Sequence, residues 1–237
     1  MYTRFSYPLD ERHIVMPGAI DPPELIPRSR MSAPPADTPP SAVRWGSYNN
    51  TSFARFFVHT GTHLDVNFHI DTDGARLEAF AVEDFIAERP CLLEITKQAR
   101  EEITAEELQQ YEAALAQADF LFVFTGFSAC RATDPKHYAS EQPGFSVGAA
   151  RYLMDRFRLK GVGVDLLGIE NIANAKSLDP PFPVHRAFLT AGRPFYLVED
   201  ADLKPLVGKA IRRAFMIPLL LPGAEAMPIT GFADLEG

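Results

Sequence analysis

The sequence contains few cysteines and no apolar run long enough to span a membrane. Only two of its 237 residues are cysteine, which is too few for a zinc ribbon or a disulfide framework. Any bound metal would therefore need imidazole and carboxylate ligands, and the chain has six histidines to supply them. The longest apolar segments fall short of the roughly 18 residues that a transmembrane helix needs.

Positive charge is also in deficit. Lys and Arg total 23 against 31 Asp and Glu, which gives a formal net charge of −8. A phosphate backbone would be repelled by this charge, so nucleic acid is not an expected partner. Without a spanning segment, a membrane is not an expected partner either. The first thirty residues carry no apolar run typical of a signal peptide, and we expect a cytoplasmic protein that acts on a small molecule.

Several common catalytic motifs are missing as well. The sequence has no Gly-x-Ser-x-Gly and no phosphate-binding loop, which disfavours serine-hydrolase and nucleotide chemistry. The pair Gly161 and Gly163 lacks the third glycine of a dinucleotide-binding fingerprint and follows a predicted helix instead of a strand.

The distribution of proline and of apolar residues predicts one α/β domain. Residues 1–45 are rich in proline and are expected to form an N-terminal arm or irregular lead-in with at most one edge strand, followed by a single domain over 46–237. In that domain, apolar patterns predict strands at 52–58, 91–95, 120–125 and 162–167, and helices at 78–87, 105–117 and 146–157. This alternation favours an α/β fold with some parallel strand pairing.

Three of the six histidines lie within the eleven residues HTGTHLDVNFH, at positions 59–69. In an extended chain His63 and Asp65 point the same way about 6.6 Å apart, close enough to share a metal ion. His59 would be about 13 Å from His63 in a straight strand. Gly61 permits a tight turn that could bring it back. The spacing thus favours a metal site, although three histidines hydrogen-bonded within a polar loop would give the same pattern.

His69 continues this spacing two residues after Asn67. In an extended chain it would lie too far from Asp65 to bind the same ion, so we expect it to act as a general base or acid near neutral pH. A fourth ligand, or a histidine that merely hydrogen-bonds to a ligand, would fit the spacing equally well.

The HTGTHLDVNFH segment resembles the signature His-x-Gly-Thr-His-x-Asp-x-Pro-x-His of the metal-dependent cyclase family. That family includes bacterial-type kynurenine formamidases and isatin hydrolases. The resemblance extends from about Trp45 to Phe232, because further similar segments follow in the family's order: Phe124–Phe127, Tyr138 with Pro143–Ser146, Gly163–Asp165, His185 with Leu189, Leu197–Glu199 and Ile217–Leu219.

The resemblance implies a fold, a set of ligands and an assembly. The expected fold is a swivelling β/β/α-type single domain with a mixed sheet or small barrel flanked by helices, assembled as a homodimer or homotetramer. The implied ligands of one or two Zn²⁺ or Mn²⁺ ions are His59, His63, Asp65, His185 and Glu199. His69 corresponds to the histidine that transfers protons.

The sequence also departs from the family pattern. Asn67 replaces the usual proline and adds a hydrogen-bond donor and acceptor, so it could orient His69 or contact substrate. Gly168 stands where the family often has serine, which argues against N-formylkynurenine as substrate. Other substrate-contact candidates are Phe182, which lies between two prolines, and Trp45 and Tyr138.

These observations predict a metal-dependent hydrolase that cleaves an amide, lactam or lactone bond of a small cyclic or aromatic substrate. Two alternatives remain at this point. The same residues could catalyse the reverse reaction, as a ring-forming cyclase or dehydratase, or they could hold a metal without catalysing any reaction.

Overall fold

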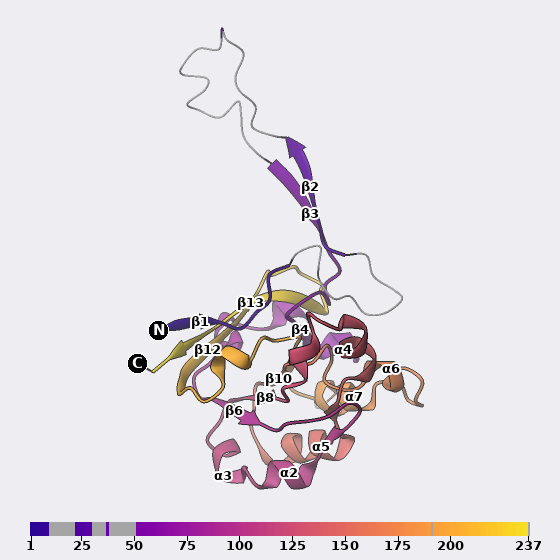
Figure 1. The fold of residues 1–237 in the computed structure, drawn as a ribbon, viewed down its shortest axis with the longest axis vertical. Coiled ribbons are helices and arrows are strands. Elements are labelled where there is room, and N and C mark those ends of the chain that lie inside the picture. The colour runs from indigo at the N-terminus through magenta and orange to yellow at the C-terminus, as the bar shows by residue number, and fades with distance from the viewer. Residues whose placement is uncertain (10–21, 30–36, 38–50, 191, 237) are drawn as a thin grey trace.

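The computed structural model describes residues 1–9, 22–29, 37, 51–190 and 192–236 (Figure 1). Its central element is a mixed sheet of nine strands. Eight of them follow one another in the order β5-β12-β13-β4-β11-β10-β8-β6, and the ninth, β1, pairs with β13. These strands are β1 (Tyr2–Arg4), β4 (His63–Val66), β5 (Ile86–Ala87), β6 (Pro90–Glu94), β8 (Phe120–Phe124), β10 (Gly161–Val164), β11 (Tyr196–Glu199), β12 (Ile211–Pro218) and β13 (Ala226–Leu235).

The sheet is parallel in one half and antiparallel in the other. Strands β6, β8, β10 and β11 run parallel, whereas β4 pairs antiparallel with both β11 and β13. Strand β6 at one end of the order also contacts β12 near the other end, so the sheet is nearly closed into a barrel. The protein is therefore a mixed α/β domain with a barrel-like sheet, as predicted.

The alternating sides of β8 explain why its sequence FLFVF is apolar throughout. Phe120 and Phe122 pack inside the barrel, while Leu121 and Val123 pack against the helices outside it. A strand covered on both faces must be apolar at every position. The helices are α2 (Ala105–Gln109), α3 (Glu112–Leu115), α4 (Pro135–Glu141), α5 (Val147–Arg156), α6 (Ile172–Ala175) and α7 (Pro183–Leu189).

Two short two-stranded sheets complete the described part. Strand β7 (Glu102–Ile103) pairs with β9 (Gly144–Phe145), and β2 (Glu24–Ser29) pairs with β3 (Thr51–Arg55). The β2–β3 hairpin projects away from the body of the domain (Figure 1). Strand β1, from the predicted N-terminal arm, pairs with β13 in the main sheet, and the predicted arm boundary at residues 45–46 lies outside the described residues.

Some predicted elements differ from the structure. The helix expected over 78–87 is instead two 3₁₀ turns, η2 (Leu77–Ala79) and η3 (Val82–Phe85), separated by an extended Phe80. The helix expected over 105–117 is broken between α2 and α3 at Tyr111, whose φ and ψ of −112° and 17° are not helical. Other 3₁₀ turns are η1 (Asn67–His69), η4 (Phe127–Cys130) and η5 (Lys204–Leu206). No helix in the described residues is long and apolar enough to cross a bilayer.

Candidate metal centre

Strand β4 carries two of the candidate ligands into the interior of the domain. His63 and Asp65 are 2% and 1% exposed, and His63 Nε2 lies 3.3 Å from Asp65 Oδ1. Strand β11 places Glu199 directly opposite His63, so that Glu199 Oε2 lies 3.5 Å from His63 Nε2. The register between these antiparallel neighbours is therefore what brings Glu199, distant in sequence, to the motif.

The turn expected before β4 is present. Gly61 has a φ of 70°, in the left-handed region that glycine tolerates best. The chain consequently folds back, and His59 Nδ1 lies 2.9 Å from Asp65 Oδ1. Thr62 stabilises this turn by donating a hydrogen bond of 2.6 Å to the carbonyl oxygen of Asp200.

His69 lies closer to Asp65 than an extended chain would allow. The 3₁₀ turn η1 follows β4 immediately and curls the backbone, so His69 Nε2 lies 3.7 Å from Asp65 Oδ2. The expectation that His69 lies too far from Asp65 to bind the same ion is therefore wrong. Its side chain is 28% exposed, whereas the His59, His63 and Asp65 side chains are all at most 5% exposed.

His185 reaches the cluster from α7. Its Nε2 is 3.2 Å from Glu199 Oε1, and its Nδ1 is 2.6 Å from Glu170 Oε1. Glu170 also accepts hydrogen bonds from the backbone N–H groups of Val184 and His185. It thus fixes both the first turn of α7 and the orientation of the His185 ring.

The residues form two groups that could each hold a metal ion. One consists of His59, Asp65 and His69, and the other of His63, Asp65 and Glu199, with ligand atoms in each group within 4.8 Å of one another. Asp65 is common to both, which suits a carboxylate bridging two ions. Imidazole with carboxylate ligands is a donor set that Zn²⁺ and Mn²⁺ accept.

Unsatisfied polar atoms provide a test of whether a metal fits. Among the described residues, five buried side-chain atoms have no hydrogen-bond partner, and three are His63 Nε2 and the two oxygens of Asp65. The short contact from His59 to Asp65 lacks hydrogen-bond geometry. Burying such atoms is costly unless another partner satisfies them, and a divalent cation would do so.

The orientation of His63 is consistent with the same role. Its Nδ1 lies 2.7 Å from the carbonyl oxygen of Gly61, which can only accept, so Nδ1 carries the proton. The Nε2 lone pair then points into the cluster, and a metal-binding histidine is typically held in this way.

The charges of the cluster shift its pKa values strongly. Burial opposes protonation of His59 and His63, but the charge of Asp65 outweighs it and raises the pKa of both. Burial also opposes ionisation of Asp65, yet the histidines, His59 first, hold its pKa well below the usual range. Burial and Asp65 act against ionisation of Glu199, and His185 and His63 nevertheless lower its pKa to about 2. A bound cation would replace protons at these sites.

Of the four predicted substrate contacts, two have other roles. Asn67 is 3% exposed, its amide donates to the carbonyls of Leu189 and Arg193 at 2.7 and 3.1 Å, and its oxygen accepts from Phe195 N–H at 3.0 Å. It joins η1 to the segment before β11 and has no polar atom left for substrate. A proline at this position could make none of these side-chain hydrogen bonds.

Tyr138 is fully buried, and its hydroxyl donates 2.8 Å to Asp200 Oδ1, so it is a core residue and not a substrate contact. Phe182 remains a candidate, because its half-buried ring lies 5.7 Å from the His185 ring, centroid to centroid. Trp45 lies outside the described residues.

The sequence analysis missed three residues that support the cluster. Glu170 orients His185. Asp200 follows Glu199 directly and forms a buried ion pair with Arg131, at 2.5 Å. Local sequence patterns do not point to these residues, since Glu170 lies 15 positions before His185, and Arg131 lies 69 positions before Asp200.

We expect Glu170→Gln to weaken metal binding or turnover by about 10–100-fold, the usual consequence of losing a carboxylate that orients a metal-binding histidine. The amide oxygen can still accept one of the two backbone N–H bonds at the start of α7, so folding should be retained. Metal titration and turnover of the purified variant would check this. In the comparison variant Glu170→Ala, the backbone N–H groups of Val184 and His185 at the start of α7 also lose their acceptor. Wild-type behaviour of both variants would contradict the role assigned to Glu170.

Fold and site together define a mixed α/β protein with a buried His/Asp/Glu cluster suited to divalent metal. The chain belongs to the Cyclase family, whose sequence profile matches residues 4–171. An uncharacterized protein of Haemophilus influenzae is 39% identical over 107 residues, which is 45% of this chain and 75% of that protein. Cyclase-like protein 3 of Oryza sativa subsp. japonica is 26% identical over 200 residues, covering 80% of this chain and 67% of that protein.

Solved structures share the fold. An isatin hydrolase bound to the product analogue thioisatinate superposes with a TM-score of 0.79 at 18% identity, covering 98% of this chain and 91% of that one. Isatin hydrolase A from Labrenzia aggregata, bound to benzyl benzoate, gives 0.78 at 19% identity, with 98% and 93% covered. A predicted metal-dependent hydrolase from Bacillus stearothermophilus gives 0.71 at 24% identity, with 98% and 97% covered.

Proposed function

We propose that this protein is a metal-dependent hydrolase that cleaves an amide, lactam or lactone bond of a small cyclic or aromatic substrate. The observation that carries the proposal is the buried Asp65 carboxylate, whose two oxygens lack hydrogen-bond donors among the described residues while three histidines and Glu199 surround it. Family membership and the isatin hydrolase fold support the choice of reaction and of substrate class.

In this proposal His59, His63, Asp65, His185 and Glu199 hold one or two Zn²⁺ or Mn²⁺ ions. When bound, such an ion would supply Lewis-acid activation of water and of the substrate carbonyl. His69 accepts the proton of the attacking water and returns it to the leaving nitrogen or oxygen. Phe182 contacts the apolar part of the substrate next to His185.

The partial exposure of His69 favours catalysis over a purely structural metal site. Structural sites are usually closed by four protein ligands, whereas a catalytic site keeps a position open to solvent and substrate. His69, with 28% of its side chain exposed, is the most accessible member of the His59, Asp65 and His69 group.

We expect removal of metal to abolish turnover. After dialysis against a chelator, hydrolysis of a panel of aryl esters, lactones, anilides and lactams should fall to background, and added Mn²⁺ or Zn²⁺ should restore it, since the ion activates both water and carbonyl. Protein dialysed without chelator is the control. Full turnover by metal-free protein would refute the proposal, and metal-loaded protein that hydrolyses none of the panel would favour a non-catalytic metal site.

We also propose a homo-oligomer, a dimer or a tetramer, in the cytoplasm. Leu25 and Ile26 on the projecting β2–β3 hairpin are 75% and 42% exposed, which is apolar surface that a second copy could cover. Cys91 and Cys130 are free thiols, which suits a reducing compartment.

Light scattering should therefore give a multiple of 26.3 kDa. The double variant Leu25→Glu/Ile26→Glu should shift the mass toward the monomer, because charges on an apolar interface oppose association. Val82→Glu, at another exposed apolar residue, should leave the mass unchanged. A wild-type monomer would contradict this assignment.

A further inference from the structure

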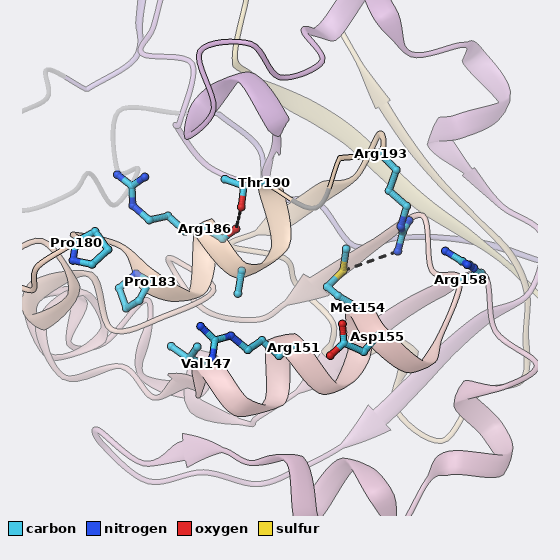
Figure 2. A pocket seen from close by; sticks show the side chains of 11 residues that line it. Val147, Arg151, Met154, Asp155, Arg158, Pro180, Pro183, Arg186, Thr190 and Arg193 are labelled. Carbon is cyan, nitrogen blue, oxygen red and sulfur yellow. Dashed lines mark hydrogen bonds between the residues drawn. The ribbon is translucent and has the colours of Figure 1, made fainter.

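A groove of about 580 Å³ lies between helices α5 and α7 (Figure 2), and none of its lining residues belongs to the metal cluster. Helix α7 contributes Pro183, Arg186 and Ala187 to the groove. Helical periodicity puts these positions on the side of α7 roughly opposite His185, which points into the metal cluster. The groove is thus a separate site on the other face of the same helix.

Four arginines from three segments line this groove. Arg151 belongs to α5 and Arg158 follows it, Arg186 belongs to α7, and Arg193 lies in the segment before β11. The single carboxylate in the lining is Asp155, which leaves a local excess of three positive charges in a protein whose net charge is −8.

The four guanidinium groups make no ion pair with any carboxylate among the residues that the structure describes. Most other arginines in the described segments do have such a partner: Arg55, Arg100, Arg131, Arg156, Arg212 and Arg213. Burial, and the positive charge of Arg158, lower the pKa of Arg193. The groove therefore has a local excess of positive charge, and none of its arginines is paired with a carboxylate of a described residue.

Two of these arginines are held in place by backbone carbonyls. Arg186 Nε donates 2.7 Å to Pro181 O, and Arg193 Nη1 donates 2.6 Å to Leu159 O. Arg193 also donates from Nη2 to Met154 Sδ at 3.8 Å (Figure 2). Arg186 thus uses one and Arg193 two of their five N–H donors, so most of the others remain available to a ligand. Because the side chains are already ordered, binding an anion would cost less conformational entropy.

We propose that this groove binds a compact phosphorylated small molecule. Arginine forks match phosphate oxygens in geometry and charge. The apolar lining, which includes Val147, Met154 and Pro180, suits the organic part of a phosphate ester. A compact anion experiences mainly the local positive field, whereas a long nucleic acid would also meet the negative charge of the surrounding surface.

Isothermal titration of the full-length, metal-loaded protein with phenyl phosphate and with inorganic phosphate tests this site. Both should bind, phenyl phosphate more tightly. Arg151 and Arg158 are exposed side chains, so the double variant Arg151→Ala/Arg158→Ala should fold normally. It should bind phenyl phosphate at least about tenfold more weakly, since it loses two charged donors. The charge-matched control Arg212→Ala/Arg213→Ala lies on β12, outside the groove, and should bind like the wild type.

A second variant separates this site from the metal centre. Asp65→Asn alters the metal cluster but not the groove, so it should retain phenyl phosphate binding even if the proposed hydrolase activity proves wrong. The proposal is overturned if the wild type does not bind phenyl phosphate at millimolar concentration. It is equally overturned if Arg151→Ala/Arg158→Ala and the control Arg212→Ala/Arg213→Ala weaken binding to the same extent. It is also overturned if binding depends on Asp65, or if a short DNA duplex binds more tightly than phenyl phosphate through the same arginines.

Discussion

Asp65→Asn is expected to eliminate bound metal and to lower turnover by at least about 10³-fold, because Lewis-acid stabilisation worth several kcal/mol is lost and each 1.4 kcal/mol is about a factor of ten. Asp65 is the only residue common to both ligand groups found in the described segments. Removing its charge therefore affects every ion that the cluster could hold. Asparagine keeps the shape of the side chain, so β4 should remain in register with β11 and β13.

The measurement is metal content by elemental analysis together with turnover on the best substrate of the panel. Asp119→Asn is a matched control, because Asp119 is also a buried carboxylate but accepts hydrogen bonds from the backbone of Glu88 and Arg89, both at 2.9 Å, away from the cluster. It should lose stability while keeping metal and activity. An Asp65→Asn protein that retains stoichiometric metal would show that the cluster is not the metal centre.

The sequence alone was sufficient for the parts of the site that are local in the chain. Strand periodicity put His63 and Asp65 on one side of β4, and Gly61 indicated the turn that returns His59 to them. The same reasoning failed at His69, because it assumed that the chain stays extended after Asp65. In the structure Asn67 bonds to Leu189, Arg193 and Phe195 and holds the backbone in a 3₁₀ turn. Those partners are more than 120 residues away in the sequence, so the local pattern around Asn67 could not predict them.

The fold shows the same division. Buried strands such as β8 were predictable because both of their faces are apolar, and α5 was predictable from its one apolar side. The place of β1 in the main sheet was not, since Tyr2–Arg4 is a short segment whose pairing with β13 is set by contacts over 220 residues away. The Glu199 ligand likewise depends on its register opposite His63, and only the family resemblance pointed to it.

His69→Ala is expected to lower the rate by about 10²–10⁴-fold, the usual contribution of a general base or acid, while leaving most of the metal bound. Burial, and then His59, keep the pKa of His69 below its ordinary value although Asp65 opposes this. The ring is therefore neutral near pH 7 and able to accept a proton. Turnover of the wild type should fall as the pH drops through this pKa, and the variant should lack that acidic limb.

This prediction distinguishes proton transfer from metal binding, which the position of His69 beside Asp65 would also allow. Loss of one ion equivalent together with activity would make His69 a ligand, whereas loss of activity with metal retained would make it the base. His137→Ala is the control, because His137 lies in α4, where its ring packs against Phe127 away from the cluster. A His69→Ala enzyme with full activity would contradict both roles and would leave the partly exposed imidazole without a part in the reaction.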